Sequence, residues 1–405
     1  MIETNPSCTL DQDSASYHTT APIRIMIYPH HIPRVFICTC TLIIISTFQG
    51  LPAFATDMSI SNVPLDHIIL DDFRGNAIPL TQTSPELIGT LKDRIPPLTN
   101  PQYSTAKEAA WLTNNDIVLV FIEKEDAHAF PTRILNFHEI VNDTIGGRPV
   151  LISYCPLCRS GLVFDRQIKT RLLTSGNTNG VYESDMVMYD HQTQSYWFQV
   201  KGEAIVGSLT GTQLTLLPAF LLPWSEWKTL YPNTQVLSRE IGFSRPYHRD
   251  PFRGYDKLGT MLGFPVKTTD SRRDPKEKIL GLNHNGVSKA YSLTQLSHTA
   301  SMDTIAGKPI VIFSDNTGQA GSIFDATIKS TTLSFFLEQE TFKDHQTKST
   351  WTLAGKATNG PLKGLHLTPL ATHNTFWFSW VAAFPHTTIY NPHSQHLIVK
   401  EAPNH

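Results

Sequence analysis

The chain has only five cysteines in 405 residues, and two of them form the stretch Cys155-Pro-Leu-Cys158. This low count excludes the disulfide-rich frameworks of small secreted domains, so an ordinary hydrophobic core must hold the fold together. The sequence also lacks a Walker-type phosphate loop, a His-Glu-x-x-His pair and a Gly-x-Ser-x-Gly nucleophile elbow. The sequence therefore gives no motif support for a P-loop nucleotidase, a zincin metalloprotease or a serine hydrolase.

The chain also lacks a strong charge of either sign. Its formal net charge is −2, with 17% charged and 40% hydrophobic residues, which is typical of a soluble globular protein. No basic cluster indicates nucleic acid or an anionic membrane surface as a partner. We therefore expect the partner to be a metal ion or a small molecule, and no nucleic acid.

The N-terminal region predicts export from the cytoplasm. A basic segment that starts near Met26 and ends at Arg34 precedes an apolar run from Val35 to Phe48, and the small-residue pattern at residues 53–55 follows. This order is typical of a secretory signal peptide that is cleaved after Ala55. The apolar run is shorter than the ~20 residues of a membrane span, although an uncleaved anchor is the alternative. We expect an extracytoplasmic protein, periplasmic or secreted, without a membrane span after cleavage.

Two stretches of the chain repeat each other. DTIGGRPVLISYCPLCRSGLVFDRQI, which begins at Asp143, matches DTIAGKPIVIFSDNTGQAGSIFDATI, which begins at Asp303, without a gap. Further on, DHQTQSYW from Asp190 matches DHQTKSTW from Asp344. We predict four parts: an N-terminal extension with the signal peptide at 1–55, a first half at 56–237, a loop-like connector at 238–278 and a second half at 279–405.

Local patterns within each half favour strands. PVLISY, LVFDRQI and MVMYD are short, rich in β-branched and aromatic residues, and bounded by Gly, Asn, Thr or Asp. Helical spacing is limited to pieces such as TRILNFHEIVND and LPWSEWKTLY. The sequence predicts a β-rich α+β fold, in which two pseudo-equivalent tandem halves consist of short antiparallel strands with a few short helices.

Several blocks, in order along the chain, resemble the domain of unknown function 3179 family. These blocks are LNFHEIVNDTIGGRPVLISYCPLCRSGLVFDR, YESDMVMYDHQTQSYW, YHRDPFRGY and EKILGLNHNGVSKAYSLTQL. The resemblance covers nearly the whole chain after the predicted cleavage site. It implies that the Cys-Pro-x-Cys block is a family feature, and it implies no particular activity.

Three interpretations of Cys155 and Cys158 remain open. A turn between two strands aims both sulfurs at one point, which favours a site for zinc, copper or another thiolate-bound metal, with His138 and His191 as the candidate further ligands. A thiol–disulfide oxidoreductase is the first alternative, although the residues after Cys158 do not resemble the helix start that lowers a thiol pKa. A non-catalytic ligand-binding module with a structural disulfide is the second.

The repeat bears on this choice. Cys155 and Cys158 align with Asp315 and Gly318, so the second half is expected to form the same turn without thiols. Because the turn does not need the thiols to form, this difference favours a chemical role over a structural one for the two cysteines of the first half. Enzyme activity would follow if a coordination position stays open, and no catalytic residue is assigned.

Other candidates have a structural alternative. Asp190 lies beside His191, but its recurrence as Asp344 favours a cap on a turn. The connector carries Arg249, Asp250 and Arg253 in the unrepeated stretch YHRDPFRGY. These side chains could hold an anionic ligand, or form salt bridges within a packed linker.

Overall fold

The structure is a computed structural model that describes residues 56–392. The predicted signal peptide and its cleavage site after Ala55 lie outside the described residues. Strands make up 42% and helices 11% of the structure, which confirms the prediction of a β-rich fold with a few short helices. The α-helices of residues 56–392 are α1 (Pro85–Leu91), α2 (Thr132–His138), α3 (Trp224–Leu230) and α4 (Trp377–Ala383). Each is too short to span a membrane.

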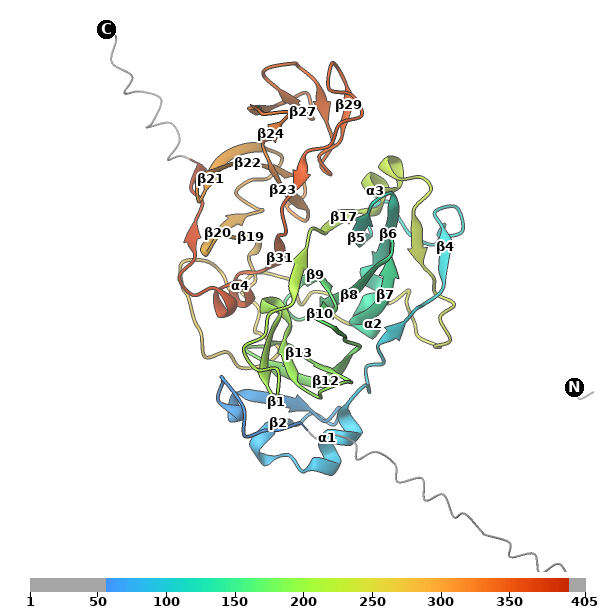
Figure 1. Cartoon of the computed structure of the whole chain (residues 1–405), viewed down its shortest axis with the longest axis vertical. Helices are drawn as coiled ribbons and strands as arrows, with labels where there is room; N and C mark the ends of the chain where they lie inside the picture. Colours follow the sequence, from blue (N-terminus) through green and yellow to red (C-terminus); the bar gives the residue numbers. More distant parts are fainter. Residues whose placement is uncertain (1–55, 393–405) are drawn as a thin grey trace, which may run out of the picture. The chain divides into compact units, whose positions relative to one another are not determined.

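The largest sheet joins strands that are far apart in the sequence (Figure 1). Asn374 of β31 pairs with Gly161 of β9, so the sheet continues from the first half of the chain into the second. Its strands, in spatial order, are β3 (Leu98–Thr99), β7 (Ile140–Ile145), β8 (Arg148–Cys155), β9 (Ser160–Asp165), β31 (His373–Phe376), β19 (Lys278–His284), β20 (Val287–Ser292) and β32 (Thr388–Ile389), with β16 (Thr215–Leu217) also pairing with β9.

A second sheet contains an irregularity that matters for the site. The register of β12 against β13 shifts between Asn177 and Gly180, and Asn179 adopts a left-handed φ of 55° there. Such bulges redirect side chains and are frequent beside functional sites. The strands of this sheet, in spatial order, are β15 (Glu203–Val206), β14 (Tyr196–Phe198), β13 (Asp185–Asp190), β12 (Ser175–Tyr182), β1 (Ile68–Asp71) and β2 (Ala77–Pro79).

The remaining strands form smaller sheets. One contains β17 (Phe220–Pro223), β5 (Ile117–Glu123), β6 (Asp126–Pro131), β18 (Gln235–Leu237) and β4 (Tyr103–Thr105); another contains β21 (Ala300–Ile305), β22 (Lys308–Ser314), β23 (Gly321–Asp325) and β30 (Thr368–Pro369). A third contains β26 (Phe335–Glu338), β27 (Thr341–Asp344), β28 (Thr350–Trp351) and β29 (Ala357–Asn359). Two hairpins pair β10 (Gln167–Ile168) with β11 (Arg171–Leu172), and β24 (Thr327–Ile328) with β25 (Thr331–Thr332).

The two repeated sequence stretches form matching strands. Ile140 of β7 pairs with Ser153 of β8, and the aligned residues Ala300 of β21 and Phe313 of β22 also pair. Between β18 and β19, residues 238–277 form turns and bends with no strand or helix. The division into two tandem halves with these boundaries stays a prediction.

Candidate metal centre

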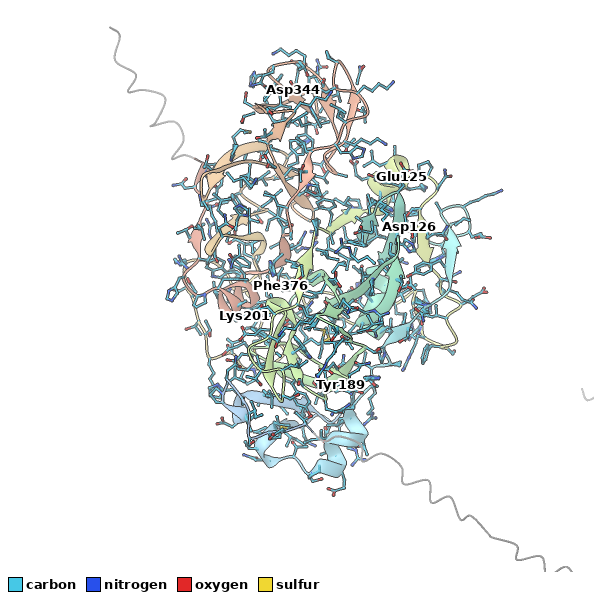
Figure 2. All side chains as sticks on the ribbon, viewed as in Figure 1. Glu125, Asp126, Tyr189, Lys201, Asp344 and Phe376 are labelled. Carbon is cyan, nitrogen blue, oxygen red and sulfur yellow. The ribbon has the colours of Figure 1, made fainter. Side chains whose placement is uncertain are left out.

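Cys155 and Cys158 lie in the tight turn that connects β8 to β9. Cys155 is the last residue of β8 and pairs with Ser160, the first residue of β9. The turn closes through Arg159, whose φ is 53°. The carbonyl of Cys158 accepts hydrogen bonds from the backbone N–H of Phe376 and the hydroxyl of Thr375, both at 2.9 Å. The end of β31, where Figure 2 labels Phe376, therefore fixes the turn.

A carboxylate completes a group of three with the two thiols. Cys155, Cys158 and Asp185, the first residue of β13, place one ligand atom each within 4.8 Å of one another. The Cys158 thiol donates to Asp185 Oδ1 at 2.5 Å, and Asp185 Oδ2 accepts from the backbone N–H of Val200 at 2.8 Å. Both cysteines are free thiols, so the turn is held without a disulfide.

This group is buried and has no cationic neighbour in direct contact. Cys155 is 1% exposed, and Cys158 and Asp185 are fully buried. Burial raises the pKa of Cys155, raises that of Cys158 well above its usual value, and raises that of Asp185 to about 6. Within residues 56–392, no lysine, arginine or histidine donates a hydrogen bond to these side chains. The thiols therefore stay protonated. Two thiols and one carboxyl lie close together without a positively charged side chain from the described residues bonded to them.

Glu139 is a further buried acidic residue near the group. It follows α2 with a φ of 58°, and its Oε2 accepts a hydrogen bond from Asn177 Nδ2 at 2.6 Å. Burial raises the pKa of Glu139 to about 8, and the nearby charge of Asp185 acts in the same direction. Glu139 and Cys155 line one cavity of about 190 Å³, where the bulged segment of β12 also contributes side chains.

The connector covers the group. Tyr255, Leu262 and Val266 pack against the apolar cluster that contains both thiols. Glu183 holds the connector by accepting hydrogen bonds from the backbone N–H groups of Lys267 at 2.8 Å and Thr268 at 2.9 Å. A segment without regular secondary structure therefore packs over the thiols.

The structure places His138 outside the group. Its Nδ1 lies 2.9 Å from the carbonyl oxygen of Pro96, and its Nε2 lies 2.7 Å from the hydroxyl of Tyr247. The side chain is fully buried, and burial lowers its pKa. Both ring nitrogens are thus engaged where α2 ends, and Asp185 occupies the place beside the thiols that the sequence analysis gave to a histidine.

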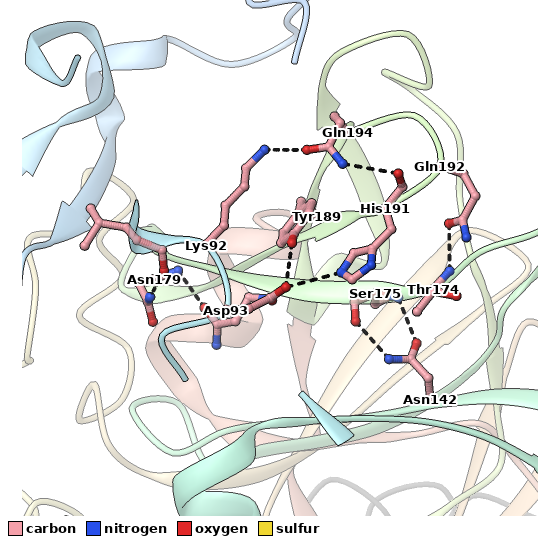
Figure 3. A network of polar contacts seen from close by, with 12 residues as sticks. Lys92, Asp93, Asn142, Thr174, Ser175, Asn179, Tyr189, His191, Gln192 and Gln194 are labelled. Atoms are coloured by element: carbon pink, nitrogen blue, oxygen red, sulfur yellow. Dashed lines mark hydrogen bonds and ion pairs between the residues drawn. The ribbon is translucent and has the colours of Figure 1, made fainter. Parts of the chain in front are cut away.

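His191 is likewise separate from the thiols. Figure 3 shows its ring directed toward Asp93, with Nε2 lying 3.3 Å from Asp93 Oδ2. The hydroxyl of Tyr189 donates to the same carboxylate at 2.6 Å. The His191 side chain is 42% exposed, so this network joins the end of α1 to the β12–β13 hairpin near the surface.

Asp190 caps a turn. Its carboxylate accepts from the backbone N–H of Thr193 at 2.5 Å and from Trp197 Nε1 at 3.0 Å. Asp344, labelled in Figure 2, accepts from its own threonine N–H and tryptophan Nε1 at the same distances. The same contacts in a segment without thiols fit the structural alternative for both aspartates.

The connector residues singled out from the sequence do not converge. Asp250 accepts from Asn136 Nδ2 at 3.2 Å and lines a second cavity of about 190 Å³ together with Arg159. Arg249 and Arg253 are exposed. The buried cation beside this second cavity is thus Arg159, whose Nη1 donates to Asn374 Oδ1 at 2.6 Å.

Sequence reasoning missed Asp185 and Glu139, although the repeat carries a signal for Glu139. The backbone N–H of Tyr154 donates to the Glu139 carbonyl, and at the equivalent place Ser314 donates to the carbonyl of Thr299. The β12–β13 hairpin closes on the pair Tyr182 and Asp185, whereas β26–β27 closes on Glu338 and Thr341. The second half therefore has threonine at the position of Glu139, and its shorter hairpin ends before any residue equivalent to Asp185, just as it lacks both cysteines.

Comparison with known proteins identifies the family. A family model described as protein of unknown function (DUF3179) matches residues 92–387, so the chain belongs to this family. No curated protein and no solved structure matches the chain. The matched range includes every residue of the candidate metal centre.

Proposed function

We propose that this member of the DUF3179 family binds a zinc-type metal ion through Cys155, Cys158 and Asp185. One observation carries the proposal: two free thiols and a carboxyl, all buried, have their ligand atoms within 4.8 Å of one another. A divalent cation supplies the positive charge that this group lacks. Its binding would displace the thiol protons and stabilise both thiolates.

The donor set narrows the class of metal. Thiolates are soft ligands that select zinc, copper(I) or iron–sulfur centres, whereas a carboxylate is a hard ligand. Zinc is a borderline ion that accepts sulfur and oxygen together, and three protein ligands with a fourth open position are typical of its catalytic sites. The mixed set therefore suits zinc better than copper(I).

Thiol–disulfide exchange is supported less well. An exchanging thiol must be accessible and must ionise near ambient pH. Here both thiols are buried, and burial raises the pKa of each. The residues after Cys158 enter strand β9, so no helix N-terminus stabilises a thiolate.

The place of action stays a proposal from the sequence. The order of basic, apolar and small residues from Met26 to Ala55 supports export, and hence function outside the cytoplasm. Mass spectrometry of the protein isolated from its natural cells should find Thr56 as the first residue. A mature chain that retains residues 26–55 would contradict export with cleavage.

The metal content of purified protein tests the proposal. We expect the wild-type chain, expressed in zinc-supplemented medium, to retain one zinc ion per chain by inductively coupled plasma mass spectrometry. Cys155→Ser and Cys158→Ser should lose it, because each removes a thiolate ligand. His138→Gln and His191→Ala are the controls and should keep the metal. If only the histidine variants lost the metal, the histidines and not the cysteines would be the ligands. A metal-free wild-type protein with an easily reduced disulfide would favour thiol exchange.

A further inference from the structure

The cavity beside Cys155 has the size of a small organic ligand. Its volume is about 190 Å³. An apolar protein cavity of about 150 Å³ is large enough to bind benzene. The walls are mainly apolar, and the side chains that form them are Phe73, Ile95, Val181, Met186, Phe252 and Phe264. The cavity could thus hold a benzene-sized body together with one small polar group.

One wall of the cavity is polar, and its groups are linked in a chain. Asn177 donates from Nδ2 to Glu139 Oε2 at 2.6 Å, and its Oδ1 accepts from the backbone N–H of Asn179 at 2.7 Å. Within the described part of the chain, the buried Asn179 Oδ1 has no hydrogen-bond partner. Asn179 is 7% exposed and Glu139 is 8% exposed. Buried polar atoms normally have a partner, so this wall indicates a ligand with matching groups.

The charge of the wall selects the ligand further. Because burial raises the pKa of Glu139 to about 8, its carboxyl is largely protonated at neutral pH and can donate a hydrogen bond. Asn179 Oδ1 can only accept one. The cavity is also lined by Asp71, and Asp185 lies close to Glu139. An anionic ligand is therefore disfavoured, and a neutral group with one acceptor and one donor fits best.

We propose that this cavity binds a small, neutral, largely apolar molecule through a primary carboxamide or an equivalent donor–acceptor group placed between Glu139 and Asn179. The apolar body of the ligand lies against Val181, Met186 and the aromatic side chains of the rim. Phe73 is 46% exposed, and the rim also includes Phe264 from the connector. Cys155 also lines this cavity, but the hydrogen bonds to the ligand come from Glu139 and Asn179, so the proposal does not depend on the proposed metal function.

Benzamide is the probe for this pocket. Benzoate, which has a similar shape but a negative charge, is the control compound. We expect saturable binding of benzamide to the full chain by ligand-observed NMR, in the presence of EDTA as well as zinc. Benzoate should bind at least about tenfold more weakly, since its charge would be buried beside acidic residues. EDTA removes any bound metal, so benzamide binding in EDTA tests the pocket independently of the metal proposal. Either proposal can fail without the other. No saturable benzamide binding by the wild type would overturn the pocket.

Variants locate the binding. Glu139→Ala should weaken benzamide binding about tenfold, because a buried hydrogen bond is lost, whereas Glu139→Gln should preserve it within about threefold. Val181→Phe should abolish binding by filling the cavity. Glu226→Ala removes another carboxyl whose pKa burial raises and is the control, with unchanged affinity. If benzamide binds folded Val181→Phe and Glu139→Ala as it binds the wild type, the ligand lies elsewhere and the proposal is wrong.

Discussion

The thiol of Cys158 donates a hydrogen bond to Asp185 Oδ1 at 2.5 Å, in a fully buried position. The two residues come from different sheets, since Cys158 precedes β9 and Asp185 begins β13. A proton holds the two groups together in the metal-free protein. A metal ion that replaces this proton would gain two adjacent ligands without a large rearrangement of the turn.

Asp185→Asn should weaken zinc binding and slightly destabilise the metal-free fold. The carboxylate is a proposed ligand, so we expect zinc affinity to fall at least about 10- to 100-fold, as even loss of an outer-shell partner can cost that much. Cys158 and Val200 donate to different oxygens of Asp185, and asparagine replaces one of these oxygens with an NH₂ group, so one donor loses its acceptor. The free energy of unfolding should therefore drop by about 1–2 kcal/mol without metal. Competition with a zinc chelator and urea unfolding measure the two effects. Unchanged zinc affinity would remove Asp185 from the ligand set.

Glu139→Gln should make stability less dependent on pH. The pKa of Glu139 is about 8 in the folded chain against a usual value of 4.5, so the folded state binds more protons than the unfolded state between these values. Stability therefore falls as pH rises through this window, by about 5 kcal/mol in total. The surrounding groups are Asn177, Asp185 and Cys155.

Urea unfolding at pH 6 and pH 8 compares wild type with Glu139→Gln. Asp185 acts with the same sign, but its pKa of about 6 places most of its effect at lower pH, and it is present in both proteins. We expect the wild type to lose more stability than the variant over this range. Equal losses would show that Glu139 ionises normally in the folded chain.

Asp190→Ala and Asp344→Ala should destabilise the protein by similar amounts. Each carboxylate is buried and caps a turn through one threonine and one tryptophan. Removing it leaves buried donors without a partner, at a cost of about 2–4 kcal/mol. Thermal or urea unfolding measures this cost, and zinc content should stay unchanged in both variants that remain folded. Loss of zinc in Asp190→Ala alone would instead give Asp190 a role at the metal centre.

Lys276→Met should expose the thiols. Lys276 is fully buried, and its Nζ donates to the carbonyls of Tyr255 at 2.7 Å and Met261 at 2.6 Å, and to the hydroxyl of Thr260 at 2.8 Å. These bonds fix the connector segment that packs over the cysteines. Their loss should increase local opening and raise the rate of thiol alkylation about tenfold. Lys278→Met, which removes an ion pair with the exposed Asp256, is the control. Equal alkylation rates would show that another segment limits access.

The local features of this fold are visible in the sequence, whereas the composition of the site is not. Runs of β-branched and aromatic residues predict β7 to β9, and the Cys-Pro-Leu-Cys stretch predicts the turn between β8 and β9. Asp185 lies far along the chain, and only the pairing of β12 with β13 and the packing of their sheet bring it to the thiols. No local pattern marks such a residue.

His138 shows the opposite case. Its position on a short helix near the cysteines in sequence favoured a ligand role, but α2 ends with this side chain bonded to Pro96 and Tyr247. Tyr247 belongs to the connector, whose path has no periodic pattern from which it could be predicted. Comparison of the two repeats position by position was the signal that could have found Glu139, because threonine stands at its equivalent place.

X-ray absorption spectroscopy at the zinc edge tests the central claim most directly. For the zinc-loaded wild-type protein, we expect two sulfur ligands at about 2.3 Å and oxygen or nitrogen ligands at about 2.0–2.2 Å. Cys158→Ser, if it still holds zinc in excess metal, should retain one sulfur. A first shell without sulfur, or one identical in wild type and Cys158→Ser, would contradict a metal centre built from Cys155, Cys158 and Asp185.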